Sequence, residues 1–323
     1  MKNPRDFILK KSEKPKGVKI KGHDFSKNAD FHDIMKSFST TGMQAKNFSE
    51  AVEIISEMIK TKTFIYLGFT SNMVTSGLRD IFRYLAEKKK VDVIVTTVGG
   101  IEEDIIKCLD DFVLGSFREN GKELRKKGIN RAGNILIPSE NYVKFEKFVL
   151  PILEEFYKRQ KETGEILNPS ELIWKLGEKI NNKNSIYYWA WKNKIPVFCP
   201  AIGDGSLGDM LYFFKSKHED FVLDIMEDIW ELNNTSTGKE KTGMIILGAG
   251  VVKHSICNAN LYRNGADFAV YINEAHEETG SDSGANPDEA VSWGKISTNG
   301  KSVKVFGDAI LLFPFIVAET FAK

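Results

Sequence analysis

The sequence predicts an α/β protein with a doubly wound, mostly parallel sheet that follows an N-terminal helical segment. Short apolar, β-branched runs alternate along the chain with Gly/Ser/Thr/Asp loops and then with helical patterns, which is the order of a parallel sheet. The runs are continuously apolar, as expected for strands that helices cover on both faces. Ligands bind such sheets at the carboxyl ends of the strands, where the polar loops gather.

The N-terminal part divides into a leader and the helical segment. Residues 1–24 are rich in lysine, so we expect a flexible, extended basic leader there. From about residue 30 to 60 the apolar residues recur at helical spacing. We expect residues 25–323 to form a single domain.

Six strands are expected in the rest of the chain, at 63–68, 91–97, 195–202, 242–250, 267–273 and 303–308. The first three lead through polar loops at 69–77, 98–100 and 203–209 into helices, and a closing helix follows the last strand. Three further polar stretches, 118–131, 158–171 and 233–243, read most simply as surface loops.

Composition excludes several classes of protein. Lysine and arginine number 45 against 44 aspartates and glutamates, which argues against nucleic acid as the main partner. The three cysteines are far apart and odd in number, so they favour reduced thiols in a cytoplasmic protein, and no histidine or cysteine spacing suggests a metal site. No run approaches the ~18 apolar residues of a membrane span.

One glycine pattern could mark a nucleotide site. Residues 203–208 read GDGSLG, a GxGxxG between an expected strand and an expected helix. Such glycines allow a tight turn and a close approach of the backbone to a pyrophosphate. Any strand-to-helix turn favours glycine, however, so the spacing alone does not decide which loop contacts phosphate.

Carboxylates at the expected strand ends suggest a second kind of site. Each one could simply cap a helix; together they would line a negatively charged crevice that attracts a cation, and Trp293 adds a face for a cation–π contact. His254 could be structural or a general base, and Lys295 a solvated charge or a nucleophilic amine. The acids are Glu102, Glu103, Asp104, Asp204, Asp209, Asp282, Asp288 and Glu289.

Most of the chain from about residue 20 onward resembles the deoxyhypusine synthase family. The most specific block is GSDSGANPDEAVSWGKI at 280–296. The other blocks that carry the resemblance are at 70–77, 96–109, 131–146, 176–210, 242–254 and 258–273.

The resemblance implies a Rossmann-like, NAD-binding fold and a homotetramer with active sites between paired subunits. It implies that NAD oxidises spermidine, that an enzyme lysine takes up the aminobutyl group as an imine, and that 1,3-diaminopropane leaves. The aminobutyl group then passes to a lysine of the translation factor 5A precursor.

Site residues carry over by position. Lys295 resembles the lysine that forms the covalent intermediate, and His254 can act as the base. The spermidine pocket implied by the resemblance comprises Glu102, Glu103, Asp209, His254, Gly280, Ser281, Asp282, Glu289, Trp293 and Lys295. The NAD site implied by it comprises Ser71, Asn72, Met73, Val74, Thr75, Thr97, Val98, Gly99, Glu103, Asp204, Ala249, Glu274, Ala275, Ser283, Asp308 and Ala309.

Three positions depart from the family pattern and leave the acceptor open. Thr279 stands where an aspartate is common, Ala249 replaces the middle residue of Gly-Gly-Gly, and Glu274 replaces a threonine. A homospermidine synthase, with putrescine as the acceptor, would share every residue argued from chemistry. A non-catalytic NAD-binding regulatory protein is the alternative from another class.

Overall fold

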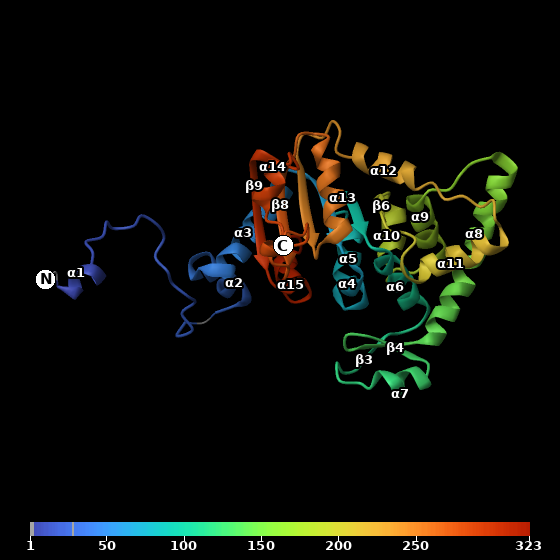
Figure 1. Ribbon diagram of the computed structural model, residues 1–323, viewed down its shortest axis with the longest axis horizontal. Helices are drawn as coiled ribbons and strands as arrows, with labels where there is room; N and C mark the ends of the chain where they lie inside the picture. The colour runs from blue at the N-terminus through green and yellow to red at the C-terminus, as the bar shows by residue number, and fades with distance from the viewer. Residues whose placement is uncertain (1–2, 28) are drawn as a thin grey trace.

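The computed structural model describes residues 3–27 and 29–323, and its centre is a six-stranded parallel sheet (Figure 1). The strands lie in the order β6-β2-β1-β7-β8-β9, and each neighbouring pair is parallel. Numbered along the chain within this sheet, the order is 3-2-1-4-5-6, that of the Rossmann fold. The predicted fold class is confirmed. The strands are β1 (Phe64–Phe69), β2 (Val93–Thr96), β6 (Val197–Phe198), β7 (Thr242–Leu247), β8 (Ala266–Asn273) and β9 (Ile296–Phe306).

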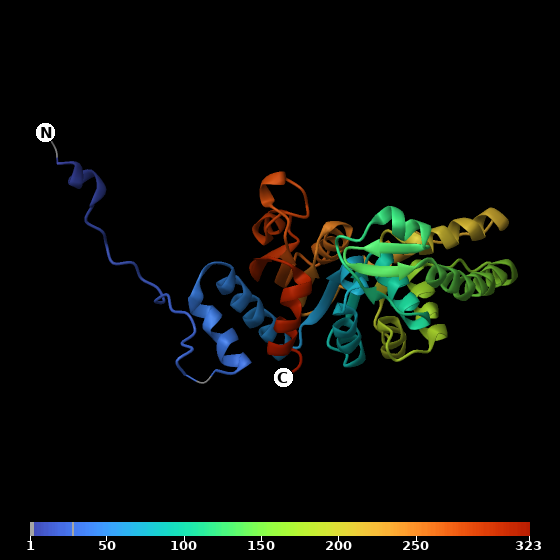
Figure 2. The same ribbon diagram turned by 90° about the horizontal axis from the view of Figure 1, so that it is seen from below.

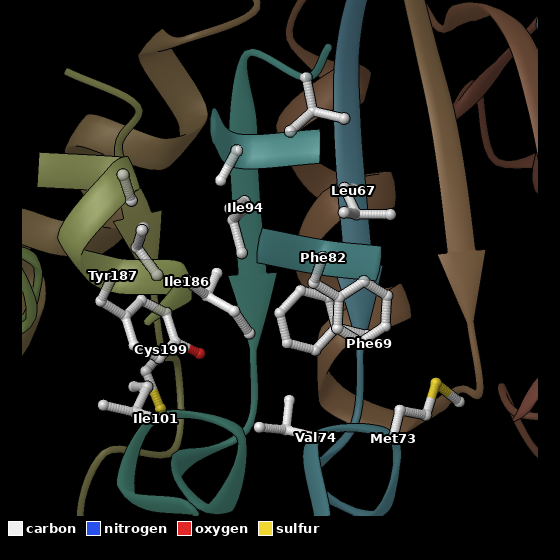
Figure 3. Packing of buried hydrophobic residues seen from close by; sticks show 14 of the residues in the cluster. Leu67, Phe69, Met73, Val74, Phe82, Ile94, Ile101, Ile186, Tyr187 and Cys199 are labelled. Carbon is white, nitrogen blue, oxygen red and sulfur yellow. The ribbon is translucent and has the colours of Figure 1, made fainter. Parts of the chain in front are cut away.

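Alternate residues of each strand enter two separate hydrophobic clusters, one on each face of the sheet. In β1, Leu67 and Phe69 belong to the larger cluster and Tyr66 to the smaller one. Phe69 stacks on Phe82, with ring centroids 4.0 Å apart, and Val74 lies beside this pair below the end of the strand (Figure 3). The strands are therefore buried on both sides, as their continuous apolar sequence predicts.

The two faces are covered unequally. The larger cluster packs under many helices: α3 (Met43–Lys60), α4 (Ser71–Thr75), α5 (Leu78–Glu87), α6 (Val98–Leu109), α8 (Ser139–Thr163), α9 (Pro169–Ile180), α10 (Ile186–Asn193), α11 (Gly205–Lys217) and α15 (Ala309–Glu319). The smaller cluster involves only α12 (Ile225–Asn234), α13 (Gly250–Leu261) and α14 (Pro287–Ser292).

The N-terminal part is helical as predicted, but in pieces. Gly42, at φ +92°, separates α2 (Phe31–Thr41) from α3. Within its described residues, from 3 onward, the leader contains one short helix, α1 (Pro4–Ile8), and otherwise runs mostly exposed and away from the sheet (Figures 1 and 2). It meets the helical segment where the Lys21 amide donates to the Thr40 carbonyl at 3.0 Å.

Several predicted boundaries are wrong, each for a local reason. Residues 98–100, expected as a loop, are the first turn of α6, and most of 203–209 is the first turn of α11. The β6 strand is only two residues long because prolines at 196 and 200 flank it and cannot donate to a ladder. The β9 strand begins at Ile296, seven residues before its predicted start. These first residues are polar and include a bulge, so the sequence does not mark them as a strand.

The polar stretch 118–131 is also more than a loop. It contains α7 (Gly121–Lys126) and enters β4 (Ile129–Ala132), which pairs with β5 (Ile135–Pro138). With β3 (Val113–Leu114) these strands form a small antiparallel sheet beside the main one. The predicted loop at 158–171 includes the end of α8 and the start of α9, and that at 233–243 includes the last residues of α12 and the first of β7. No helix in the described ranges is long and apolar enough to cross a membrane.

Candidate functional site

The chain order reverses between β1 and β7, and the loops that follow β1 and β2 meet beside this switch point. The Ser71 amide and Oγ both contact Thr97 Oγ1, at 3.0 and 2.7 Å. A Cβ at Gly99 would lie 2.4 Å from Ser71 Oγ, so only glycine allows this approach. The two predicted NAD-binding segments, 71–75 and 97–99, therefore form one packed unit at the carboxyl edge.

Two half-buried ionisable side chains, Glu103 and Lys107, hold this unit in place. Thr75 Oγ1 donates to Glu103, and burial raises the pKa of that carboxyl to about 7. Lys107 donates to the carbonyls of Val74, Thr75 and Ser76 at 2.7, 2.5 and 3.0 Å. Burial lowers the pKa of Lys107 to about 8, and its three acceptors are the carbonyls that end α4.

The GxGxxG pattern binds a side chain of its own chain. Gly205 adopts φ +67° to open α11, and a Cβ at Gly208 would lie 2.1 Å from the Gly203 carbonyl oxygen. The Leu207 amide, in the first turn of α11, donates to Glu102 Oε2 at 2.7 Å. The positive end of α11 is thus already paired with a carboxylate. The glycines serve a tight turn here, and the amide at the start of the helix is paired with a carboxylate of the same chain.

Acids surround Glu102. Asp204 caps α11 by accepting from the Gly205 amide, and Asp209 lies exposed one turn further on. Burial, first of all, and then the nearby Asp209 and Asp204 raise the pKa of Glu102. With Glu103, these residues form an acidic group, the α6–α11 group, that borders the switch point.

A second group of predicted site residues lies along the outer side of α13. His254 Nδ1 and Asp282 Oδ1 are 3.4 Å apart, and both side chains are accessible to solvent. Lys295 lies just beyond α14, after Trp293 and Gly294, and its ammonium is 6.0 Å from the ring centroid of Trp293, which is 66% exposed. We call these residues, with exposed Glu289, Gly280 and Ser281, the α13–α14 group.

The two groups do not meet within one chain. Val98 and Leu207, from the elements of the α6–α11 group, belong to the larger hydrophobic cluster. Val252 and Ala290, from α13 and α14, belong to the smaller cluster on the opposite face. Moreover, α14 lies at the other end of the strands from α4 and α6 (Figure 1). The expectation that all the acids line one crevice is therefore not met by a single chain.

The remaining predicted cofactor residues follow other strands at the same carboxyl edge. Ala249 follows β7; Glu274, Ala275 and Ser283 follow β8; Asp308 and Ala309 follow β9. The β9 strand lies three strands from β1, roughly 14 Å at the usual strand spacing.

The packed unit at the switch point fits a dinucleotide. It offers the half-buried hydroxyls of Ser71 and Thr97, the exposed amide of Asn72 and the exposed carboxylate of Asp204. Hydroxyls and amides suit phosphate oxygens, and a carboxylate suits ribose hydroxyls. Because the pKa of Glu103 is raised to about 7, about half of this carboxyl is protonated at neutral pH, which reduces its repulsion toward an anionic ligand.

The departures from the family pattern have defined surroundings. Thr279 ends a short 3-10 helix, where its hydroxyl donates to the His276 carbonyl at 3.0 Å and lies 2.9 Å from Ser281 Oγ. It therefore shapes the turn before Gly280. Glu274 is exposed, directly after β8, and Ala249 caps α13 with its backbone.

Two lysines that sequence analysis missed hold the loop carrying Gly280 to Ser283. Lys253, 2% exposed, donates to the carbonyls of Asp282 and Ala285, and Lys304 donates to those of Ala275 and Gly284 at 2.7 and 2.6 Å. A signal existed in the sequence. Lys253, Ile256 and Cys257 share a helical face, which places this lysine on the buried side of α13.

We expect Lys253→Met to destabilise the fold by about 1–3 kcal/mol, because the buried Ala285 carbonyl and the part-buried Asp282 carbonyl lose their donor. The matched control is Lys301→Met, since Lys301 is an exposed lysine paired with Glu57 and should contribute no more than about 1 kcal/mol. Denaturant unfolding of both variants makes the comparison. Equal losses of stability in the two variants would argue against the role of Lys253 in holding this loop.

A family model for deoxyhypusine synthase matches residues 33–320. The chain is 50% identical to a deoxyhypusine synthase of Senecio vernalis, over 100% of this chain and 94% of the relative. It is 48% identical to homospermidine synthase 2 of the same species, over 98% and 94%.

A solved structure agrees with these matches. The crystal structure of a protein from Entamoeba histolytica, provisionally assigned as a deoxyhypusine synthase, matches with a TM-score of 0.69 and 36% identity, over 94% of this chain and 97% of that one. The family model and the relatives all span nearly the whole length, and so the chain belongs to the deoxyhypusine synthase family of enzymes.

Proposed function

We propose that this protein transfers the aminobutyl group of spermidine to a lysine of the translation factor 5A precursor, with NAD as its cofactor. The observation that carries the proposal is the α13–α14 group. It combines a lysine, a tryptophan face and a His254–Asp282 contact, and all of these residues except His254 lie in the block at 280–296. These residue types suit the oxidation of an amine and the capture of the resulting imine.

Each residue has a chemical task in this reaction. His254, oriented by Asp282, removes the proton from the spermidine amine. A bound NAD would supply the hydride acceptor for this oxidation and the hydride donor for the final reduction. Neutral Lys295 then attacks the imine carbon and 1,3-diaminopropane leaves, so the aminobutyl group is held on Lys295 as an imine until the acceptor amine displaces it. Trp293 offers a face to the cationic chain.

The acids of the α6–α11 group complete the amine pocket when a second copy of the chain supplies them. The outer side of α12 and α13, on the face of the sheet that fewer helices cover, supports such pairing because it exposes large apolar side chains. These are Ile225, Met226, Ile229, Trp230, Val251, Leu261 and Tyr262. We place the shared sites between paired subunits of a homotetramer.

We assign NAD to the switch point. Its contacts there come from 71–75, Thr97, Val98, Gly99, Glu103 and Asp204, which the packed unit and the α6–α11 group hold together. Asp308 and Ala309, three strands away, would reach a cofactor bound to the paired copy. The three free cysteines of the described ranges favour a cytoplasmic setting.

A homospermidine synthase is the second candidate, because a relative with that name is 48% identical over 98% of the chain. The half-reaction on spermidine is the same in both, and only the acceptor differs. Thr279 and Glu274, near the loop of the α13–α14 group, are the first residues to examine if putrescine is the acceptor.

The test is incubation with NAD and labelled spermidine, first without an acceptor, then with the factor precursor, then with putrescine. Label on a lysine of the precursor, with NAD-dependent release of 1,3-diaminopropane, is the expected result. Label that reaches only putrescine would replace this proposal by the second candidate. Tight NAD binding without any release of 1,3-diaminopropane would instead favour a non-catalytic NAD-binding regulatory protein.

A further inference from the structure

The short helix α4 consists of predicted NAD-binding residues, and side chains of α6 and its N-cap hold it at both ends. At its start, the Ser71 amide and hydroxyl lie 3.0 and 2.7 Å from Oγ1 of Thr97, the N-cap of α6. At its end, Thr75 Oγ1 donates to the Glu103 carboxyl. The position of α4 at the switch point is therefore set by α6.

A second side chain of α6 binds the end of α4. The chain leaves the helix at Ser76, whose backbone is extended, with φ −76° and ψ −176°. The carbonyls of Val74, Thr75 and Ser76 converge on Lys107 Nζ, at 2.7, 2.5 and 3.0 Å. Carbonyls at a helix end lack amide donors, and a cation there also opposes the negative end of the helix dipole.

Lys107 has no donor left for a ligand. A lysine ammonium carries three N–H groups, and here each can donate to one of the three carbonyls. The side chain is half-buried, and its ammonium lies 5.3 Å from the ring centroid of Phe112. Lys107 can therefore act on a bound cofactor only through the segment that it holds.

We propose that Lys107 is a positioning residue for NAD, because it fixes the end of the 71–75 segment at the switch point. The inference rests on the NAD site of the proposed function and adds a residue outside the predicted set. Without the ammonium, the Thr75–Glu103 contact alone joins the end of α4 to α6. The groups of α4 that face the cofactor then shift, and NAD binding weakens although every residue that contacts NAD is still present.

The effect should be confined to the cofactor. The apolar side of α6 packs into the larger hydrophobic cluster, whereas α13 and α14 pack into the smaller one on the opposite face. Lys295 and His254 therefore keep their surroundings when Lys107 is replaced. A higher KM for NAD with little change in kcat is the expected signature, since saturating NAD restores the occupied site.

The test compares Lys107→Met with wild type in the full chain. Calorimetry without spermidine gives the NAD dissociation constant, and release of 1,3-diaminopropane gives KM for NAD and kcat. We expect NAD affinity to fall about tenfold or more, because the segment loses its charged hydrogen bonds, and kcat to stay within about threefold. The matched control is Lys88→Met, which removes an exposed lysine beside Glu87 and should bind NAD as wild type does.

Unchanged NAD affinity in Lys107→Met would overturn the inference, and so would an equal loss in Lys88→Met. If Lys107→Met fails to fold, Lys107→Arg takes its place, because a planar guanidinium cannot serve three converging carbonyls as an ammonium does. Its affinity for NAD should fall at least about threefold, and wild-type affinity would again overturn the inference. A wild type that binds NAD without releasing diaminopropane contradicts the proposed transfer alone, since the dissociation constants still test Lys107. A wild type that binds no NAD contradicts both.

Discussion

Replacing Lys295 by arginine should lower the transfer of label from spermidine to the acceptor by at least ~10³-fold, because arginine remains protonated and cannot act as the nucleophile. The change keeps the positive charge over Trp293, where the lysine ammonium lies 6.0 Å from the ring centroid. Loss of activity would therefore report the missing neutral amine rather than a missing cation.

Borohydride reduction after incubation with NAD and labelled spermidine checks the same point chemically. Wild type should retain label on Lys295, and the variant should retain none while still binding NAD. The matched control is Lys301→Arg, an exposed lysine of β9 six residues along the chain. A Lys295→Arg enzyme that transfers label within tenfold of wild type would contradict the covalent role.

The parallel sheet could be predicted because its signal is local. Continuous apolar runs and the loops after them mark each strand, and the order of strands and helices gives the fold class. The β9 strand shows the limit of this reasoning. Its first half, ISTNGKS, is polar and pairs with β8 around a bulge, so no period in the sequence marks it.

The sequence predicts a set of site residues but not how they are arranged in space. The glycines at 203–208 suggested a phosphate loop, but the Leu207 amide is paired with Glu102, which lies 105 residues earlier in the chain. The helical spacing of Lys253 shows that it is buried, but it does not show its partners, which are backbone carbonyls of a distant loop. Such long-range pairings leave no local pattern, and a separation between the two faces of a sheet is likewise invisible in the sequence.

Mixing two inactive variants should restore activity if the site is shared between copies. Asp209→Asn changes the α6–α11 group and Lys295→Ala changes the α13–α14 group, which lie on opposite faces of the sheet in one chain. A mixed pair of subunits then contains one site with both defects and one site with none. With random pairing, half of the pairs are mixed, and about a quarter of wild-type activity should return.

The control is a mixture of His254→Ala and Lys295→Ala, both in the α13–α14 group. Every site in that mixture receives its α13–α14 group from a defective chain, so activity should stay at the level of the single variants. Co-expression with two different affinity tags isolates the mixed assemblies for assay. If Asp209→Asn and Lys295→Ala also fail to complement each other, each site must be built within one chain. The α6–α11 acids would then have no part in binding the amine, because the sheet separates them from Lys295.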